Sequence, residues 1–139
     1  MIKGLDHVTI LVNDLPGAIA QYKKLLNKDI RPPEPVQTAQ PRTIRGFKGA
    51  VFSFGTTNIE IITPTDDNGP WARRLKTYGN GLYLVCLKVD NLRETVEELR
   101  GKGVRLVDDP GPGTEPITDR LVCIHPASAC GAMILLLER

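Results

Sequence analysis

The chain has 139 residues, of which 41% are hydrophobic and 24% charged, and its 18 Lys and Arg against 16 Asp and Glu give a formal net charge of +2. This composition is that of one folded domain and excludes a disordered chain, which needs low hydrophobicity and high net charge. The small charge, with both signs interspersed, argues against a nucleic-acid partner. No run of 18 apolar residues is present, so we expect no membrane span.

Two further features concern the compartment. The N-terminal residues lack the basic and apolar pattern of a secretory signal. The three cysteines, Cys86, Cys123 and Cys130, have no CxxC spacing. An odd count without that spacing argues against a disulfide framework or a cysteine-based zinc site. We therefore expect a reduced, cytoplasmic protein whose cysteines are small buried core residues.

The first half of the chain predicts a strand, a helix and two further strands. β-branched residues and period-two alternation over residues 5–12 (LDHVTILV) predict a strand. Asn13 and Asp14 then offer an N-cap, and Pro16 falls in the first helical turn. Apolar residues follow at helical spacing and predict one core-facing stripe of Leu15, Ala18, Ile19, Tyr22, Leu25 and Leu26. The remaining elements are a proline-rich loop at 31–45, with an edge strand as the alternative, and strands at 50–54 and 58–63.

The second half repeats this order after a polar stretch at 64–80, in which residues 70–77 predict a short helix. Asp90 or Asn91 caps the next predicted helix, which two glycines end. The elements predicted from here on are a strand at 82–89, a helix ending at Gly101 and Gly103, a short strand at 104–107, a loop at 108–116, and strands at 120–124 and 132–138 around a hairpin.

The two halves form an internal repeat. Residues 5–22 superpose on 82–99 at a constant offset of 77 positions, and residues 59–62 fall on 134–137 at an offset of 75. A half of this size would be only marginally stable alone, so the halves are expected to share one sheet or core. We predict an α+β fold in a single domain, 1–139, made of two βαβββ repeats (about 3–64 and about 81–139) joined by a 65–80 connector.

Four segments carry a resemblance to a known superfamily. They are LDHVTILVNDL (5–15), IEIITP (59–64), GLYLVCLKVDNL (81–92) and IHPASACGAMILLLER (124–139). In this order and spacing the chain resembles the vicinal oxygen chelate superfamily, which includes glyoxalase I, extradiol dioxygenases and the bleomycin-resistance proteins. It is most similar to the methylmalonyl-CoA epimerase and lactoylglutathione lyase branch. The resemblance implies a curved mixed sheet around a cleft.

The resemblance also implies a divalent metal with one ligand from the first and one from the last strand of each half. The matching positions are His7 and Glu60 in the first half, and Leu84 and Leu135 in the second. Imidazole and carboxylate suit a first-row metal, but leucine cannot ligate one. The internal repeat alone places His7 over Leu84 and Glu60 over Leu135. We therefore expect a degenerate half-site of His7 and Glu60, which would hold a metal poorly.

His7 and Glu60 are the candidate catalytic residues. A carboxylate on a partly apolar wall suits a general base, so Glu60 is the expected base. His7 would donate a hydrogen bond to the developing oxyanion. The alternatives are a structural histidine and a solvated carboxylate. Leu84 and Leu135 are the expected apolar walls of the substrate pocket, and Glu34 lies where the epimerases place a second catalytic carboxylate.

Four other residues have predominantly structural interpretations. His125 precedes Pro126 in a hairpin, which favours turn chemistry. Tyr83 is expected to face away from Leu84 and to serve packing. In proteins that this chain resembles, the segment that holds Trp71 and Tyr78 often helps to close the cleft or a dimer contact.

Three functions remain open at this level. The leading hypothesis is an isomerase or lyase that acts on a small oxygenated acid or a CoA or glutathione thioester. The second is a metal-free binding protein that sequesters a small molecule, as bleomycin-resistance proteins do. The third is a degenerate structural or regulatory module. In each case the expected partners are a small molecule and a second copy of the chain in a homodimer.

Overall fold

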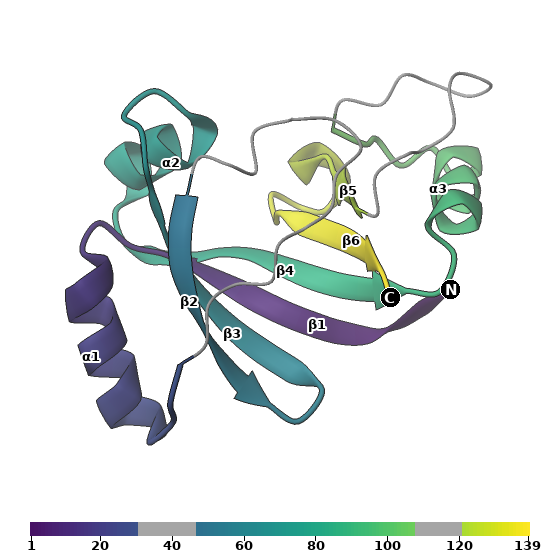
Figure 1. The fold of residues 1–139 in the computed structure, drawn as a ribbon. Coiled ribbons are helices and arrows are strands. Elements are labelled where there is room, and N and C mark those ends of the chain that lie inside the picture. Colours follow the sequence, from purple (N-terminus) through teal and green to yellow (C-terminus); the bar gives the residue numbers. More distant parts are fainter. Residues whose placement is uncertain (31–46, 108–120) are drawn as a thin grey trace. The chain divides into compact units, whose positions relative to one another are not determined.

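A computed structural model describes residues 1–30, 47–107 and 121–139. These residues form an α+β fold with a mixed sheet, which confirms the predicted fold class (Figure 1). The elements are β1 (Ile2–Leu11), α1 (Leu15–Leu26), β2 (Phe47–Phe54), β3 (Thr57–Pro64), α2 (Pro70–Tyr78), β4 (Gly81–Val89), α3 (Leu92–Gly101), β5 (Leu121–Ile124), a 3-10 turn (Pro126–Ser128) and β6 (Ile134–Glu138). No helix among these residues is long and apolar enough to cross a bilayer.

The described residues divide into two compact units, and β1 runs through both. The first unit takes Met1–Asp6 and the described residues from Leu84 onward, and the second takes the described residues from His7 to Tyr83. The strands follow the order β2-β3-β1-β4-β6-β5. β1 pairs with β3 in parallel and β2 with β3 antiparallel, and the same pairings recur as β4 with β6 and β5 with β6.

The strand register of the two halves follows the sequence repeat. Thr9 lies opposite Glu60 between β1 and β3, and Cys86 lies opposite Leu135 between β4 and β6. Thr9 falls on Cys86 at the offset of 77 positions, and Glu60 falls on Leu135 at the offset of 75. Positions that the repeat superposes therefore occupy equivalent places in their strand pairs.

The second unit has its own core beneath α1. Val12, Leu15, Phe52 and Ile61 are buried, and partly buried residues of α1 pack on them. Asp14 caps the helix as expected, since its Oδ1 accepts a hydrogen bond from the Gly17 amide at 3.1 Å. The predicted stripe was wrong at one position. Leu25 is 70% exposed, because it lies beyond the edge of the face that Tyr22 and Leu26 present to the core.

The first unit is built around α3 and β6. Val89, Leu92, Val96, Leu106 and Leu136 form its buried cluster. Asn91, one of the two predicted caps, accepts a hydrogen bond from the Glu94 amide at 3.0 Å. The other candidate, Asp90, instead accepts from the Met1 ammonium and pairs with Lys3. These two cations hold the pKa of Asp90 well below its usual range.

Some predictions change in detail or lie outside the described residues. The strand expected at 104–107 is reduced to one bridge between Leu106 and Ile124. Cys86 is buried as expected and Cys123 is partly buried, but Cys130 is exposed, because it sits in the turn that follows the 3-10 segment. The loop at 31–45, including Glu34, and the loop at 108–116 fall on residues that the structure does not describe.

Candidate functional site

His7 and Glu60 lie on the same face of two adjacent strands in the second unit. His7 is opposite Asn58, and Thr9 is opposite Glu60. Because side chains alternate along a strand, His7, Thr9 and Glu60 share one face, with His7 one two-residue step from Glu60. Both His7 and Glu60 are partly buried. The structure thus brings the two predicted catalytic residues onto one surface.

Thr9 is the neighbour that orients Glu60. Its side chain is almost fully buried, at 1% exposure, and its hydroxyl donates a hydrogen bond to Glu60 Oε1 at 3.4 Å. A buried hydroxyl needs such a partner, and a donor on one oxygen limits how the carboxylate can turn. Thr9 was not predicted as a site residue, because its place opposite Glu60 follows from the strand register rather than from a local sequence pattern.

Leu84 and Leu135 occupy the equivalent places in the first unit. Cys86 is opposite Leu135, so Leu84 stands one two-residue step from Leu135 on the same face. Both leucines are partly buried. The face that carries an imidazole and a carboxylate in one half carries two aliphatic side chains in the other.

The donors present do not fit the four-ligand metal site that the superfamily implies. Two of the four positions have no donor atom, because they are leucines. Asp6 and Cys86 of the first unit offer ligand atoms within 4.8 Å of one another. However, Asp6 Oδ1 already pairs with Arg139 Nε at 2.7 Å, and a carboxylate held by arginine is a poor ligand.

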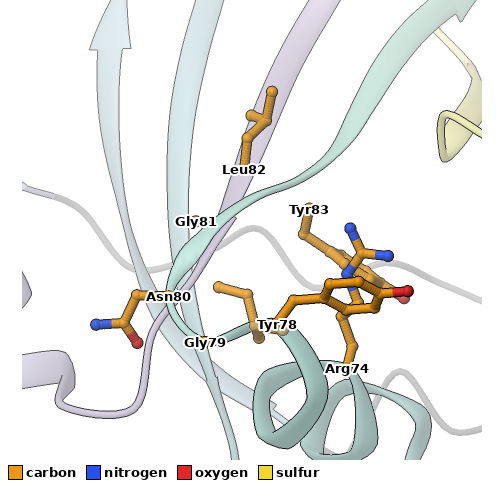
Figure 2. Close-up of a pocket in the computed structure, with 8 residues that line it drawn as sticks. Arg74, Tyr78, Gly79, Asn80, Gly81, Leu82 and Tyr83 are labelled. Carbon is orange, nitrogen blue, oxygen red and sulfur yellow. The ribbon is translucent and has the colours of Figure 1, made fainter.

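A pocket lined by described residues lies elsewhere in the second unit. It has a volume of about 170 Å³ where α2 leads into β4 (Figure 2). Its lining residues are Leu11, Arg74, Tyr78, Gly79, Asn80, Gly81, Leu82 and Tyr83. Leu84, Leu135 and Glu60 are not among them. From the sequence, Tyr83 was expected to serve packing, and Tyr78 to lie in a segment that helps to close the cleft or a dimer contact. Arg74 was not predicted, because its only signal in the sequence is a basic residue four positions before an aromatic one.

Two other residues are placed in structural roles. His125 Nδ1 accepts a hydrogen bond from the Ala127 amide at 3.1 Å, which confirms its role in the turn. Trp71 packs edge-on against Phe47, with ring centroids 5.5 Å apart. Neither residue lines the pocket.

Comparison with known proteins identifies relatives over nearly the whole chain. The family model described as the glyoxalase/bleomycin resistance protein/dioxygenase superfamily matches residues 6–123. Mitochondrial methylmalonyl-CoA epimerase of Bos taurus is 30% identical over 139 residues, which cover 97% of this chain and 73% of the relative. An ethylmalonyl-CoA/methylmalonyl-CoA epimerase of Cereibacter sphaeroides is 26% identical and is covered over 98% of its length.

Solved structures agree with these matches. The crystal structure of methylmalonyl-CoA epimerase from Mycobacterium tuberculosis superposes with a TM-score of 0.80 at 28% identity, covering 99% of this chain and 88% of that one. A Streptomyces coelicolor methylmalonyl-CoA epimerase, at 18% identity and a TM-score of 0.80, shares the fold over 99% of this chain and 98% of its own. The chain therefore belongs to the glyoxalase/bleomycin resistance protein/dioxygenase superfamily, on the branch of the methylmalonyl-CoA epimerases.

Proposed function

We propose that this protein is an isomerase that moves a proton at the carbon next to the carbonyl of a small acyl-CoA thioester. The observation that carries the proposal is the shared face of His7 and Glu60, with Thr9 holding one oxygen of the carboxylate. The Bos taurus and Cereibacter sphaeroides relatives support a CoA thioester over a glutathione thioester, since both are named as CoA-thioester epimerases. The Streptomyces coelicolor epimerase was solved in complex with 2-nitronate-propionyl-CoA, a CoA derivative, which agrees with this choice.

The proposed reaction begins with Glu60 as the base. The carbon–hydrogen bond next to the thioester carbonyl breaks, the proton passes to a carboxylate oxygen of Glu60, and the electron pair moves onto the carbonyl oxygen. His7 donates a hydrogen bond to that oxygen and so stabilises the enolate. Return of a proton to the opposite face of the carbon gives the epimer. Glu34, the predicted second carboxylate, is the candidate donor for this step.

In this proposal the metal site is degenerate. A divalent metal in a protein of this family would supply positive charge to the enolate oxygen. Here two of the four ligand positions are leucines, so we assign the stabilisation of that oxygen to His7. One hydrogen bond stabilises an enolate less than a divalent cation does, which favours a substrate with an acidic carbon–hydrogen bond, such as a malonyl-type thioester.

The test is exchange of the substrate proton. Methylmalonyl-CoA is incubated with the protein in deuterated water, and loss of the signal of that proton is followed by NMR. We expect Glu60→Gln to slow exchange by about a hundredfold or more, because a positioned base contributes on that order. Glu94→Gln, which changes an exposed carboxylate on α3, is the matched control and should exchange at the rate of the unaltered protein. Full exchange by Glu60→Gln would exclude Glu60 as the base.

A second candidate function is metal-free binding without turnover, and Leu84 and Leu135 favour it. Two partly buried aliphatic side chains where donors are expected make that half apolar, as ligand pockets often are. The same experiment separates the two functions. A binding protein would bind a thioester tightly and exchange no proton. In that case Glu60→Gln would change neither the binding of the thioester nor the exchange of its proton.

A further inference from the structure

We infer that Arg74, Tyr78 and Tyr83 form a binding site for a phosphate of the nucleotide part of a CoA thioester. The inference depends on the proposed function for the identity of the ligand. It concerns the pocket at the junction of α2 and β4, which the proposed proton transfer does not use.

The exposed side chain of Arg74 lies beside two aromatic rings. The Arg74 guanidinium lies 4.2 Å from the ring centroid of Tyr78 and 5.9 Å from that of Tyr83. In Figure 2 its end group lies close to both tyrosine rings. A guanidinium over an aromatic ring uses its planar face for that contact. The N–H donors of a guanidinium lie in its plane, where they can bind an oxyanion with two parallel hydrogen bonds.

Arg74 differs from the other cations of its helix in the groups that it contacts. Arg73 donates to the Asn68 carbonyl at 2.7 Å, and Lys76 donates to the Asp67 carbonyl at 3.0 Å. No carboxylate pairs with Arg74 within the described part of the chain, where its guanidinium contacts the two rings. An exposed cation without an acidic neighbour attracts an anion from solution.

The surroundings of Arg74 fit a nucleotide better than a lone carboxylate. Gly79 and Gly81 have positive φ, and a Cβ added at either would meet nothing within 4 Å. Leu82 is 61% exposed and Tyr78 69% exposed. Bare backbone with apolar and aromatic surfaces beside a cation allows a base or ribose to lie against the protein while the phosphate binds the guanidinium.

The position of the pocket relative to Glu60 agrees with this assignment. Leu11 lines the pocket and lies on β1, two residues beyond Thr9, which contacts Glu60. Two residues of a strand span about 7 Å, and both side chains share one face. The pocket is thus offset from the carboxylate along the strand. It would take a part of the thioester other than the carbons that react at Glu60.

The experiment measures binding of adenosine 3′,5′-bisphosphate, the phosphorylated nucleoside end of CoA, by isothermal titration calorimetry. We expect Arg74→Gln to weaken binding about tenfold or more, because charge-assisted hydrogen bonds are lost. Arg73→Gln removes a neighbouring charge from the same helix and should change the Kd by less than about twofold. Tyr78→Phe keeps the ring and should bind normally, whereas Tyr78→Leu should bind more weakly. Circular dichroism checks that each variant is folded.

A second measurement separates the phosphate from other anions. Proton exchange is followed with methylmalonyl-pantetheine, a thioester that lacks the nucleotide. We expect Arg74→Gln to raise the KM for methylmalonyl-CoA and to leave exchange of the pantetheine thioester unchanged. Equal impairment of both thioesters would mean that Arg74 holds the carboxylate of the acyl group, which would overturn the inference. Equal binding of the bisphosphate by Arg74→Gln and the unaltered protein would also overturn it.

The two proposals can fail separately. Bisphosphate binding that depends on Arg74, in a protein that exchanges no proton, would support the nucleotide site and refute the isomerase. Exchange that depends on Glu60, without bisphosphate binding, would do the reverse.

Discussion

Asp6 is a buried carboxylate whose charge is balanced by the last residue of the chain. Asp6 is 3% exposed, and its Oδ1 lies 2.7 Å from Arg139 Nε. Removing one partner of a buried ion pair leaves a charge without its counterion, which costs more than the pair contributes. Because the Arg139 side chain is 44% exposed, solvent can replace part of the lost interaction.

We therefore predict that Arg139→Met lowers the free energy of unfolding by about 1–3 kcal/mol, as measured by urea denaturation. Arg93→Met on the exposed face of α3 is the control and should change it by less than about 0.5 kcal/mol. The double variant Asp6→Asn/Arg139→Met should be less destabilised than the sum of the two single variants. An additive result would show that the two side chains do not stabilise each other.

At the scale of the elements, two glycines in regular structure have opposite surroundings. Gly49 lies in β2, and a Cβ built on it would stand 2.5 Å from the carbonyl oxygen of Ile61 in β3. Gly101 ends α3, and a Cβ there would meet nothing within 4 Å. The Ile61 carbonyl oxygen is a backbone atom and cannot move away from Gly49 without distorting the pairing of β2 with β3. A Cβ at Gly101 has open space around it.

The two glycine-to-alanine changes should accordingly shift stability in opposite directions. Gly49→Ala should destabilise by about 1–3 kcal/mol, since the added carbon overpacks a fixed contact. Gly101→Ala should stabilise by about 0.5–1 kcal/mol, since alanine restricts the unfolded chain and favours the helix. Thermal unfolding of both variants gives the comparison. A stabilising Gly49→Ala would mean that β2 and β3 lie further apart than the structure places them.

At the scale of the whole molecule, the two halves repeat one arrangement with different chemistry. The pairings of β1, β2 and β3 recur in β4, β5 and β6, and the register places Glu60 and Leu135 at equivalent positions. The family would surround one metal with donors from both halves. At the four positions that the resemblance implies, His7 and Glu60 carry ligand atoms, whereas Leu84 and Leu135 carry none.

Supplying the missing donors tests this interpretation. We expect the unaltered protein to bind Co²⁺ weakly, and Leu84→His/Leu135→Glu to bind it at least about a hundredfold more tightly, as followed by the visible absorption of the ion. Leu82→His/Leu135→Glu moves the imidazole two residues along the same strand and should give no such gain. Equal affinity of the two double variants would show that the added side chains bind the metal without forming the family site.

Much of this protein could be predicted from local patterns in its sequence. Alternation and helical spacing predicted every strand and α-helix that the structure describes, because one buried face suffices to set each period. They also predicted a strand at 104–107, which the structure reduces to a single bridge. The caps at Asp14 and Asn91 followed from residue chemistry. The resemblance to a family, and the repeat beside it, singled out His7 and Glu60.

The tertiary structure alone decided which distant side chains meet. The contacts of Asp6 with Arg139, of Thr9 with Glu60 and of Arg74 with Tyr83 depend on strand register and on how a helix end sits beside a strand. No local period encodes them, because each joins side chains whose approach is determined by packing rather than by spacing along the chain. The sequence by itself determined the helices and strands, and it determined that His7 and Glu60 carry ligand atoms where the repeat has leucines in the other half. The packing of those helices and strands determined which side chain each charged group contacts.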